Sequence, residues 1–234
     1  MTRLQTNHDA EPYENELEHL ADEIAWVGAR CHSLGARIEA DQEADEVPAP
    51  LLIEAGASSE ATTDTERKVA RLAAQEVELR RQIDARLATT SEAGRMLGLE
   101  CLAREYDLDQ VEATVLLLTA IPALGMDLYE TLGSLGKFGF AIMSVSPELV
   151  AVFGDLDLAA RVRLRGVLDE NSRLMQAGLI EVGWDTSDAL QEFWMATIHL
   201  TPKAYRVMIG ERLEQPAVGR CPDCGQPRRV VAEA

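Results

Sequence analysis

The chain has 234 residues and is acidic, with 40 Asp and Glu against 22 Lys and Arg and a net charge of −18. No apolar run reaches the roughly 20 residues that span a bilayer, so we expect no membrane insertion. The N-terminus lacks the apolar region of a secretory signal, and four cysteines are too few for a disulfide scaffold. We therefore expect a cytoplasmic location.

Negative charge is concentrated at the N-terminal end. Residues 1–64 contain 15 acidic and 3 basic residues, a net of −12, which leaves −6 for the rest of the chain. Lys and Arg side chains that neutralise phosphates supply most non-specific affinity for DNA. The charge balance therefore argues against DNA and favours protein partners. We expect residues 1–13 to be a disordered acidic segment.

A heptad pattern predicts one long helix over residues 14–41. Apolar residues recur at the a and d positions of the repeat. They are Leu17, Leu20, Ile24, Val27, Cys31, Leu34 and Ile38. The stripe has two interpretations: packing against a second helix of the same chain, which we favour, and dimerisation into a homo-oligomer. In both, Cys31 acts as a small hydrophobe.

A second helix is expected over residues 65–88, after a linker at 42–64 that contains two prolines and a glycine. Its bases outnumber its acids, whereas the first helix is acidic. Because opposite charges beside an apolar seam select partners, the two helices predict an antiparallel hairpin or coiled coil within residues 14–90.

Residues 91–212 have the pattern of a compact helical domain. Asp107 and Gln110 fit a capping box, and Ser146 followed by Pro147 is typical of a helix start. The helices expected there cover residues 92–105, 108–121, 126–136, 146–153, 158–168 and 170–177.

The end of this domain predicts a two-stranded hairpin. Residues 178–184 and 193–200 are rich in β-branched and aromatic side chains, and a polar loop lies between them. We expect Trp184 and Trp194 to pack across the hairpin. Thr201 and Pro202 then begin a last helix. The outline is mainly α: an N-terminal helical hairpin followed by a winged-helix domain with a small β-hairpin.

Residues 97–210 resemble the winged-helix region of bacterial AAA+ ATPases, some of which accompany contractile injection systems. The positions that carry the resemblance are Glu112, Leu116, Leu117, Leu118, Asp127, Tyr129, Leu179, Ile180, Leu200, Pro202 and Gly210. The resemblance implies a role beside an AAA+ ATPase or in a larger assembly. In such ATPases the phosphate-binding loop follows this region, and we expect no such loop in the 24 residues after Gly210.

No nucleotide is expected as a cofactor. The glycine cluster at residues 133–139 lacks the spacing of a phosphate-binding loop, and Phe138 stands where a hydroxyl must hold the metal. We therefore expect a non-enzymatic interaction or assembly module that acts as an adaptor or a regulatory subunit. The alternatives are a winged-helix transcription regulator with a metal-binding tail and a regulatory fragment of a split AAA+ ATPase.

The tail at residues 213–234 is expected to be flexible and contains the motif Cys221-Pro222-Asp223-Cys224-Gly225. Two thiolates at this spacing, Cys221 and Cys224, grip one edge of a zinc ion in zinc knuckles. Zinc or another metal and an unliganded remnant both remain open. A structural zinc site needs four ligands, which Cys31 with His32, His199 or a second subunit would complete. Cys31 with His32 is the poorest of these, because adjacent residues of a helix rarely converge on one metal.

Two further groups of residues have structural interpretations. Arg161, Arg163 and Arg165 alternate within one expected helix, which spreads them around it, so we expect solvated or intramolecularly paired arginines rather than a DNA contact. His199 lies in an expected strand, where a packed core histidine is the favoured role.

Overall fold

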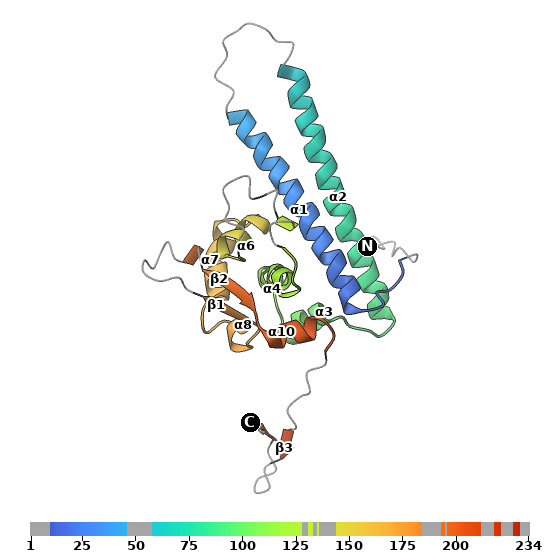
Figure 1. Cartoon of the computed structure of the whole chain (residues 1–234), viewed down its shortest axis with the longest axis vertical. Coiled ribbons are helices and arrows are strands. Elements are labelled where there is room, and N and C mark those ends of the chain that lie inside the picture. Colours follow the sequence, from blue (N-terminus) through green and yellow to red (C-terminus); the bar gives the residue numbers. More distant parts are fainter. Residues whose placement is uncertain are drawn as a thin grey trace, which may run out of the picture.

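The computed structural model describes residues 10–45, 58–127, 131–132, 135, 144–183, 193–194, 196–211, 218–220 and 227–229, with residues 43–45, 58–63, 218–220 and 227–229 described by their backbone alone. The fold is mainly α with a small antiparallel β-hairpin, as predicted. Two long helices project from a rounded body that has α4 at its centre (Figure 1).

The projecting helices are α1 (Glu16–Asp45) and α2 (Ser58–Glu92), which lie side by side and antiparallel (Figure 1). Both predicted helices are present, and each extends into the predicted linker, of which residues 46–57 lie outside the described residues. Opposite charges pair across the two helices as expected. The pairs are Arg30–Glu76 at 2.7 Å, Arg80–Glu23 at 3.0 Å, Lys68–Glu39 at 2.7 Å, Arg86–Asp22 at 2.7 Å and Arg86–Glu18.

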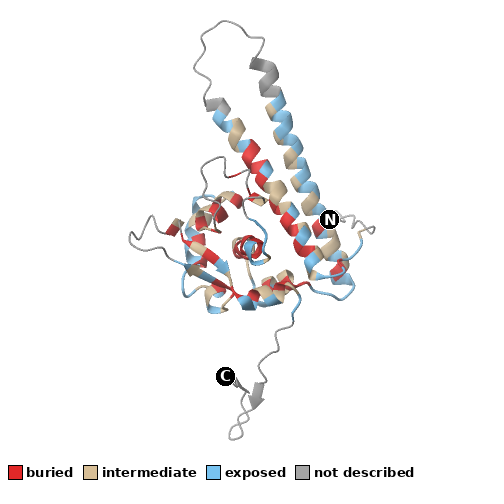
Figure 2. Ribbon diagram, in the orientation of Figure 1, coloured by how far each residue is buried: buried red, intermediate tan, exposed pale blue. Residues whose placement is uncertain are grey.

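The heptad stripe of α1 packs against the body as well as against α2. Its buried members belong to the same hydrophobic cluster as the side chains of α4 and α6. They are Leu20, Ile24, Val27, Cys31 and Leu34. Figure 2 shows buried residues along α1 and α4, whereas α2 is mostly intermediate or exposed. Hairpin and body therefore share one core. Leu17, at the start of the predicted stripe, is 56% exposed.

Replacing Leu20 by Ala tests this shared core. Leu20 is 2% exposed. We expect its truncation to lower the free energy of unfolding by about 2–5 kcal/mol, because it leaves a cavity between α1 and the body. The matched control is Leu17→Ala in the same helix, which should change it by no more than about 0.5 kcal/mol. Urea unfolding followed by circular dichroism measures both. Equal effects would contradict the packing.

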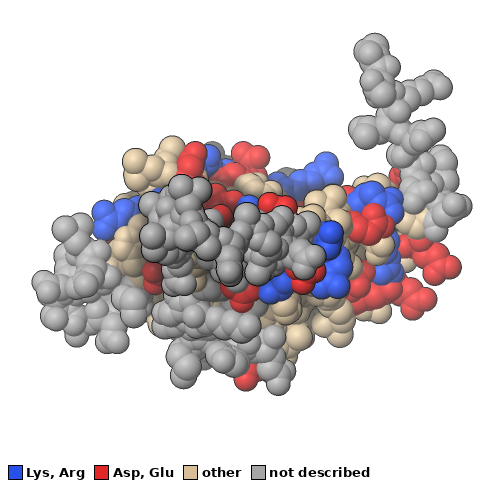
Figure 3. All heavy atoms as spheres, turned by 90° about the horizontal axis from the view of Figure 1, so that it is seen from above, with Lys and Arg blue, Asp and Glu red and all other residues tan. Residues whose placement is uncertain are grey.

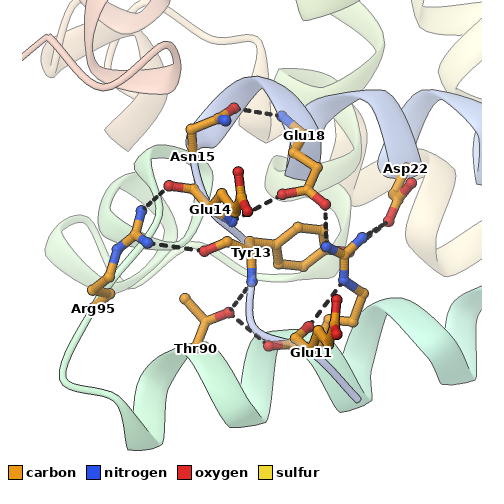
Figure 4. A network of polar contacts seen from close by, with 9 residues as sticks. Glu11, Tyr13, Glu14, Asn15, Glu18, Asp22, Thr90 and Arg95 are labelled. Atoms are coloured by element: carbon orange, nitrogen blue, oxygen red, sulfur yellow. Dashed lines mark hydrogen bonds and ion pairs between the residues drawn. The ribbon is translucent and has the colours of Figure 1, made fainter.

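The segment before α1 is fastened to the end of α2 (Figure 4). Tyr13 is fully buried, its backbone N–H donates to Thr90 Oγ1 at 2.9 Å, and its hydroxyl donates to Asp22 at 3.1 Å. The guanidinium of Arg86 lies 3.9 Å from the centroid of the Tyr13 ring. Arg95 donates to the carbonyls of Tyr13 and Glu14 at 2.9 and 2.7 Å. Burial raises the pKa of Tyr13, so the hydroxyl remains a neutral donor. Residues 1–9 of the predicted disordered segment lie outside the described residues.

The body begins with α3 (Gly98–Glu105) and α4 (Gln110–Ala123). Helix α3 starts later than predicted, because α2 continues to Glu92 and a turn follows. Gly98 sits against α10 (Pro202–Met208), and a Cβ there would overlap the backbone carbonyl of Val207. Glycine therefore permits the close approach of α3 and α10.

The capping box at α4 involves a different residue pair from the predicted one. Asp109, not Asp107, accepts from the backbone N–H groups of Val111 and Glu112 at 2.7 and 3.0 Å. Glu112, not Gln110, accepts from the Asp109 N–H at 2.9 Å. Asp107 instead lies in the preceding turn with a φ of 48°. From Val115 to Ile121 every residue of α4 is buried, which explains its central place in the body.

The rest of the body contains α6 (Pro147–Phe153), α7 (Leu158–Val167) and α8 (Arg173–Gln176), close to the predicted helices. The predicted helix at 126–136 lies mostly outside the described residues. Strands β1 (Ile180–Gly183) and β2 (Thr197–Leu200) pair antiparallel, as expected. The Ile198 N–H also donates to the Val145 carbonyl at 2.8 Å, so the chain before α6 lies beside β2.

His199 is exposed, and the expectation of a packed core histidine is wrong. Side chains alternate along a strand, and Ile198 already occupies the buried face of β2. His199 therefore lies opposite Glu181 in the register and outside the core. Within the tail that we expected to be flexible, β3 (Val218–Arg220) pairs antiparallel with β4 (Pro227–Arg229).

Candidate interaction surface

Helices α6 and α7 form a helix–turn–helix on the body. As predicted, Ser146 caps α6 by accepting from the Leu149 N–H at 3.2 Å, and Pro147 occupies the first turn. The chain then turns through Asp155, with a φ of 51°, and Asp157 caps α7 by accepting from the Ala160 N–H at 2.8 Å. Each cap satisfies an amide that the first helical turn leaves without a partner, which sets the direction of α7.

The three arginines of α7 contact other parts of the protein, in agreement with their expected intramolecular role. Arg163 forms an ion pair with Asp109 at the start of α4. Arg161 donates to the Leu156 carbonyl at 3.0 Å, and its guanidinium lies 5.9 Å from the Trp194 ring centroid.

Arg165 lies over the ring of Phe193, with 4.9 Å between the guanidinium carbon and the ring centroid. Phe193 packs edge-on against Trp194, with ring centroids 5.1 Å apart. These aromatic contacts join α7 to the segment that leads into β2. Trp184 and the loop at 185–191 lie outside the described residues.

A fourth arginine, Arg173 of α8, holds the buried carboxylate of Glu112. Arg173 reaches both Glu112 oxygens, at 2.6 and 3.2 Å, and also donates to the Asp107 carbonyl. The Glu112 side chain is 4% exposed and that of Arg173 45%. Because a buried carboxylate is costly without a partner, this pair fixes α8 against α4.

Replacing Arg173 by Ala should lower the free energy of unfolding by about 1–3 kcal/mol, since Glu112 would lose its charged partner. The matched control is Arg206→Ala. The Arg206 side chain is 61% exposed and lies 3.6 Å from Glu211. Its loss should cost at most about 1 kcal/mol. Urea unfolding of both variants measures the difference, and an Arg173→Ala protein as stable as the control would contradict the role of the pair.

The outward face of α7 carries two exposed apolar side chains beside the exposed Arg163 and Arg165. Leu158 is 79% exposed and Val162 65%, whereas Leu164 and Val167 of the same helix are buried in the core. Leu158 and Val162 are one helical turn apart, so they lie next to each other on the surface. Sequence reasoning missed this pair. The sequence signal for the pair is that two apolar residues of α7 lie four positions apart, on the opposite side of the helix from Leu164 and Val167.

An apolar cavity of about 160 Å³ lies where α1, α4 and α6 meet. Trp26 of α1 and Phe153 of α6 pack edge-on within it, with ring centroids 5.7 Å apart. Arg30 lines the same cavity and is held by the Phe153 carbonyl at 2.7 Å and by Glu76 at 2.7 Å. The other lining residues are Gln110, Val111, Thr114, Val150, Gly154 and Leu156.

The candidate metal ligands are not brought together by the described residues, which contain no group of three or more His, Cys, Asp and Glu side chains that could hold a metal. Cys31 is fully buried, and burial raises its pKa to about 12, which disfavours the thiolate that metals require. His32 is exposed, and its Nδ1 lies 2.7 Å from the Gly28 carbonyl. Cys221 and Cys224 lie outside the described residues, as does nearly all of the glycine cluster at 133–139, so the zinc site remains a prediction.

The helix–turn–helix, the strand pair that follows it and the short segment beside β2 together define a winged-helix protein with an N-terminal helical hairpin. Residues 1–215 match the family described as "Winged helix domain, variant", and the chain belongs to that family. Comparisons with curated proteins and with solved structures give no match. The family match gives no link to AAA+ ATPases or to contractile injection systems.

A winged-helix domain is a module that binds DNA or protein. Among the described residues, no helix has the length and apolar character needed to cross a membrane. The choice between the two kinds of partner therefore depends on the chemistry of the surface that α7 presents.

Proposed function

We propose that this winged-helix protein is a non-enzymatic protein-binding module that acts as an adaptor or a regulatory subunit. The observation that carries the proposal is the composition of α7. Its outward face presents Leu158 and Val162, and its arginines contact a carboxylate, a carbonyl and two aromatic rings of the same chain.

The position of α7 makes its composition informative. In helix–turn–helix proteins that bind DNA, the second helix enters the major groove and contacts base edges and phosphates. Such a helix needs polar and basic side chains on its outer face. An exposed leucine and valine instead suit the apolar centre of a protein interface.

Electrostatics favours the same choice. The net charge of −18 repels the phosphate backbone, and residues 155–173 contain four acidic residues as well as four arginines. These are Asp155, Asp157, Asp169 and Glu170 against Arg161, Arg163, Arg165 and Arg173. Figure 3 views the molecule from the end of the hairpin, and on that face the basic and acidic side chains of the described residues are intermingled.

The finer part of the proposal concerns the partner. The resemblance of residues 97–210 to the winged-helix region of AAA+ ATPases suggests a partner ATPase or a larger assembly that contains one. The shared core of hairpin and body supports an adaptor role, because it packs the projecting hairpin against the body that carries α7. We expect no ATP hydrolysis by the purified protein alone.

Fluorescence anisotropy with a labelled random DNA duplex tests the choice of partner. We expect no binding at micromolar protein in about 150 mM salt, because fewer contacts to phosphate leave little counterion release. The probe should also remain free when Arg165, an exposed α7 arginine whose guanidinium lies over the Phe193 ring, is replaced by Glu.

The proposal fails if the wild-type protein binds the duplex at that salt and the Arg165→Glu variant loses the binding. The outcome would favour the alternative, a winged-helix transcription regulator. A Leu158→Ser variant provides the control, since it removes apolar surface without changing charge and should behave as the wild type towards DNA.

A further inference from the structure

We propose, resting on the protein-binding function above, that the cavity between α1, α4 and α6 and the Leu158–Val162 pair form one docking site. Its occupant is an amphipathic helical segment of a partner protein with basic flanks. One leucine or phenylalanine side chain of that segment enters the cavity, and its neighbouring apolar residues cover Leu158 and Val162.

The cavity has the size and chemistry for one such side chain. Its volume is about 160 Å³, and five of its lining residues are apolar: Trp26, Val111, Val150, Phe153 and Leu156. An engineered cavity of about 150 Å³ with apolar walls stays dry and binds benzene. A phenyl or isobutyl group is of the size that this volume accommodates.

The walls of the cavity are held in place before any partner binds. The Arg30 guanidinium lies 5.2 Å from the Phe153 ring centroid and 5.9 Å from that of Trp26. Its hydrogen bonds to the Phe153 carbonyl and to Glu76 tie α1 to α6 and α2. Because these side chains are already ordered, binding would cost little further conformational entropy.

The cavity and the exposed pair flank the same turn. Leu156 lines the cavity and precedes Leu158 by two residues. Arg163, one residue after Val162, pairs with Asp109, which is the neighbour of the cavity residue Gln110. A single helix can therefore contact both features, with apolar residues spaced by three or four, as in helix-in-groove recognition.

The acidic residues around the turn favour basic residues at the two ends of the partner helix. Asp155 and Asp157 are exposed between the cavity and the apolar pair. Asp155 pairs with Arg37 at 3.4 Å, but its side chain is 66% exposed and remains accessible to a further cation. Lys or Arg residues beside the apolar positions of the partner would meet these carboxylates. Complementary charge raises the association rate and disfavours acidic competitors.

A synthetic helical peptide tests the site, with leucines spaced by three and four and lysines at its flanks. Its addition to the full-length ¹⁵N-labelled protein should shift the indole signal of Trp26 and the amide signals of Val111 and Phe153. Thr114→Phe, which places a ring in the cavity, should weaken binding at least about tenfold. Circular dichroism and thermal unfolding verify that this variant folds.

The exposed pair has a matched control on the hairpin. Val162 is 65% exposed, and Val77 of α2 is 66% exposed. Val77 does not line the cavity and does not belong to α7. Val162→Ser should weaken the peptide about tenfold, whereas Val77→Ser should leave its affinity unchanged. Neither change should lower the thermal stability, because both side chains face solvent.

The docking site is refuted if the peptide shifts none of the three signals, or if Thr114→Phe and Val162→Ser bind it as tightly as the wild type. Concentration-dependent shifts at these signals without peptide would also refute it, since they would make a second copy the occupant. Neither result affects the proposed function. That function is contradicted by DNA binding, whereas failure of this peptide to bind contradicts only the docking site.

Discussion

The burial of the α1 stripe is the interaction on which the rest of the structure depends. Val27 and Cys31 are fully buried in one cluster with Leu116 and Leu118 of α4. The apolar area removed from water stabilises the hairpin and the body together, at roughly 25 cal/mol per Å². Without this contact, Trp26 and Arg30 would face solvent, and the cavity between α1, α4 and α6 would lose one wall.

The contacts of the charged side chains then influence which kind of partner the surface can bind. The arginines that a winged helix would offer to DNA are engaged by Asp109, Glu112 and the aromatic rings before β2. Arg163 and Arg173 are paired with carboxylates, Arg161 and Arg165 lie over aromatic rings, and α7 also presents the exposed Leu158 and Val162. The same fold can therefore serve protein recognition, because partner choice depends on side chains at the site and not on the fold.

Local patterns in the sequence predicted the elements well. Heptad and apolar spacing indicated α1, α2 and α4, and the serine–proline and threonine–proline pairs indicated the starts of α6 and α10. In these cases the signal is contained in a few neighbouring residues. The opposite charges of the first two helices likewise predicted the antiparallel hairpin, because electrostatic pairing requires only that the helices lie side by side.

Features that depend on packing between distant residues could not be predicted in the same way. Two capping motifs overlap at Asp107 and Asp109, and the one used is the one that leaves Glu112 in reach of Arg173. His199 faces outward because the register with β1 places Ile198 inward. The burial of Tyr13 could not be predicted without knowing where α2 ends. The cavity could not be predicted without knowing how three helices pack together.

Native-state hydrogen exchange in low concentrations of denaturant tests the shared core most directly. If hairpin and body form one cooperative unit, the amides of Val27 and Cys31 in α1 should exchange with the same opening free energy as those of Leu116 and Leu118 in α4. A distinctly lower opening free energy for α1, with α4 still protected, would contradict the account.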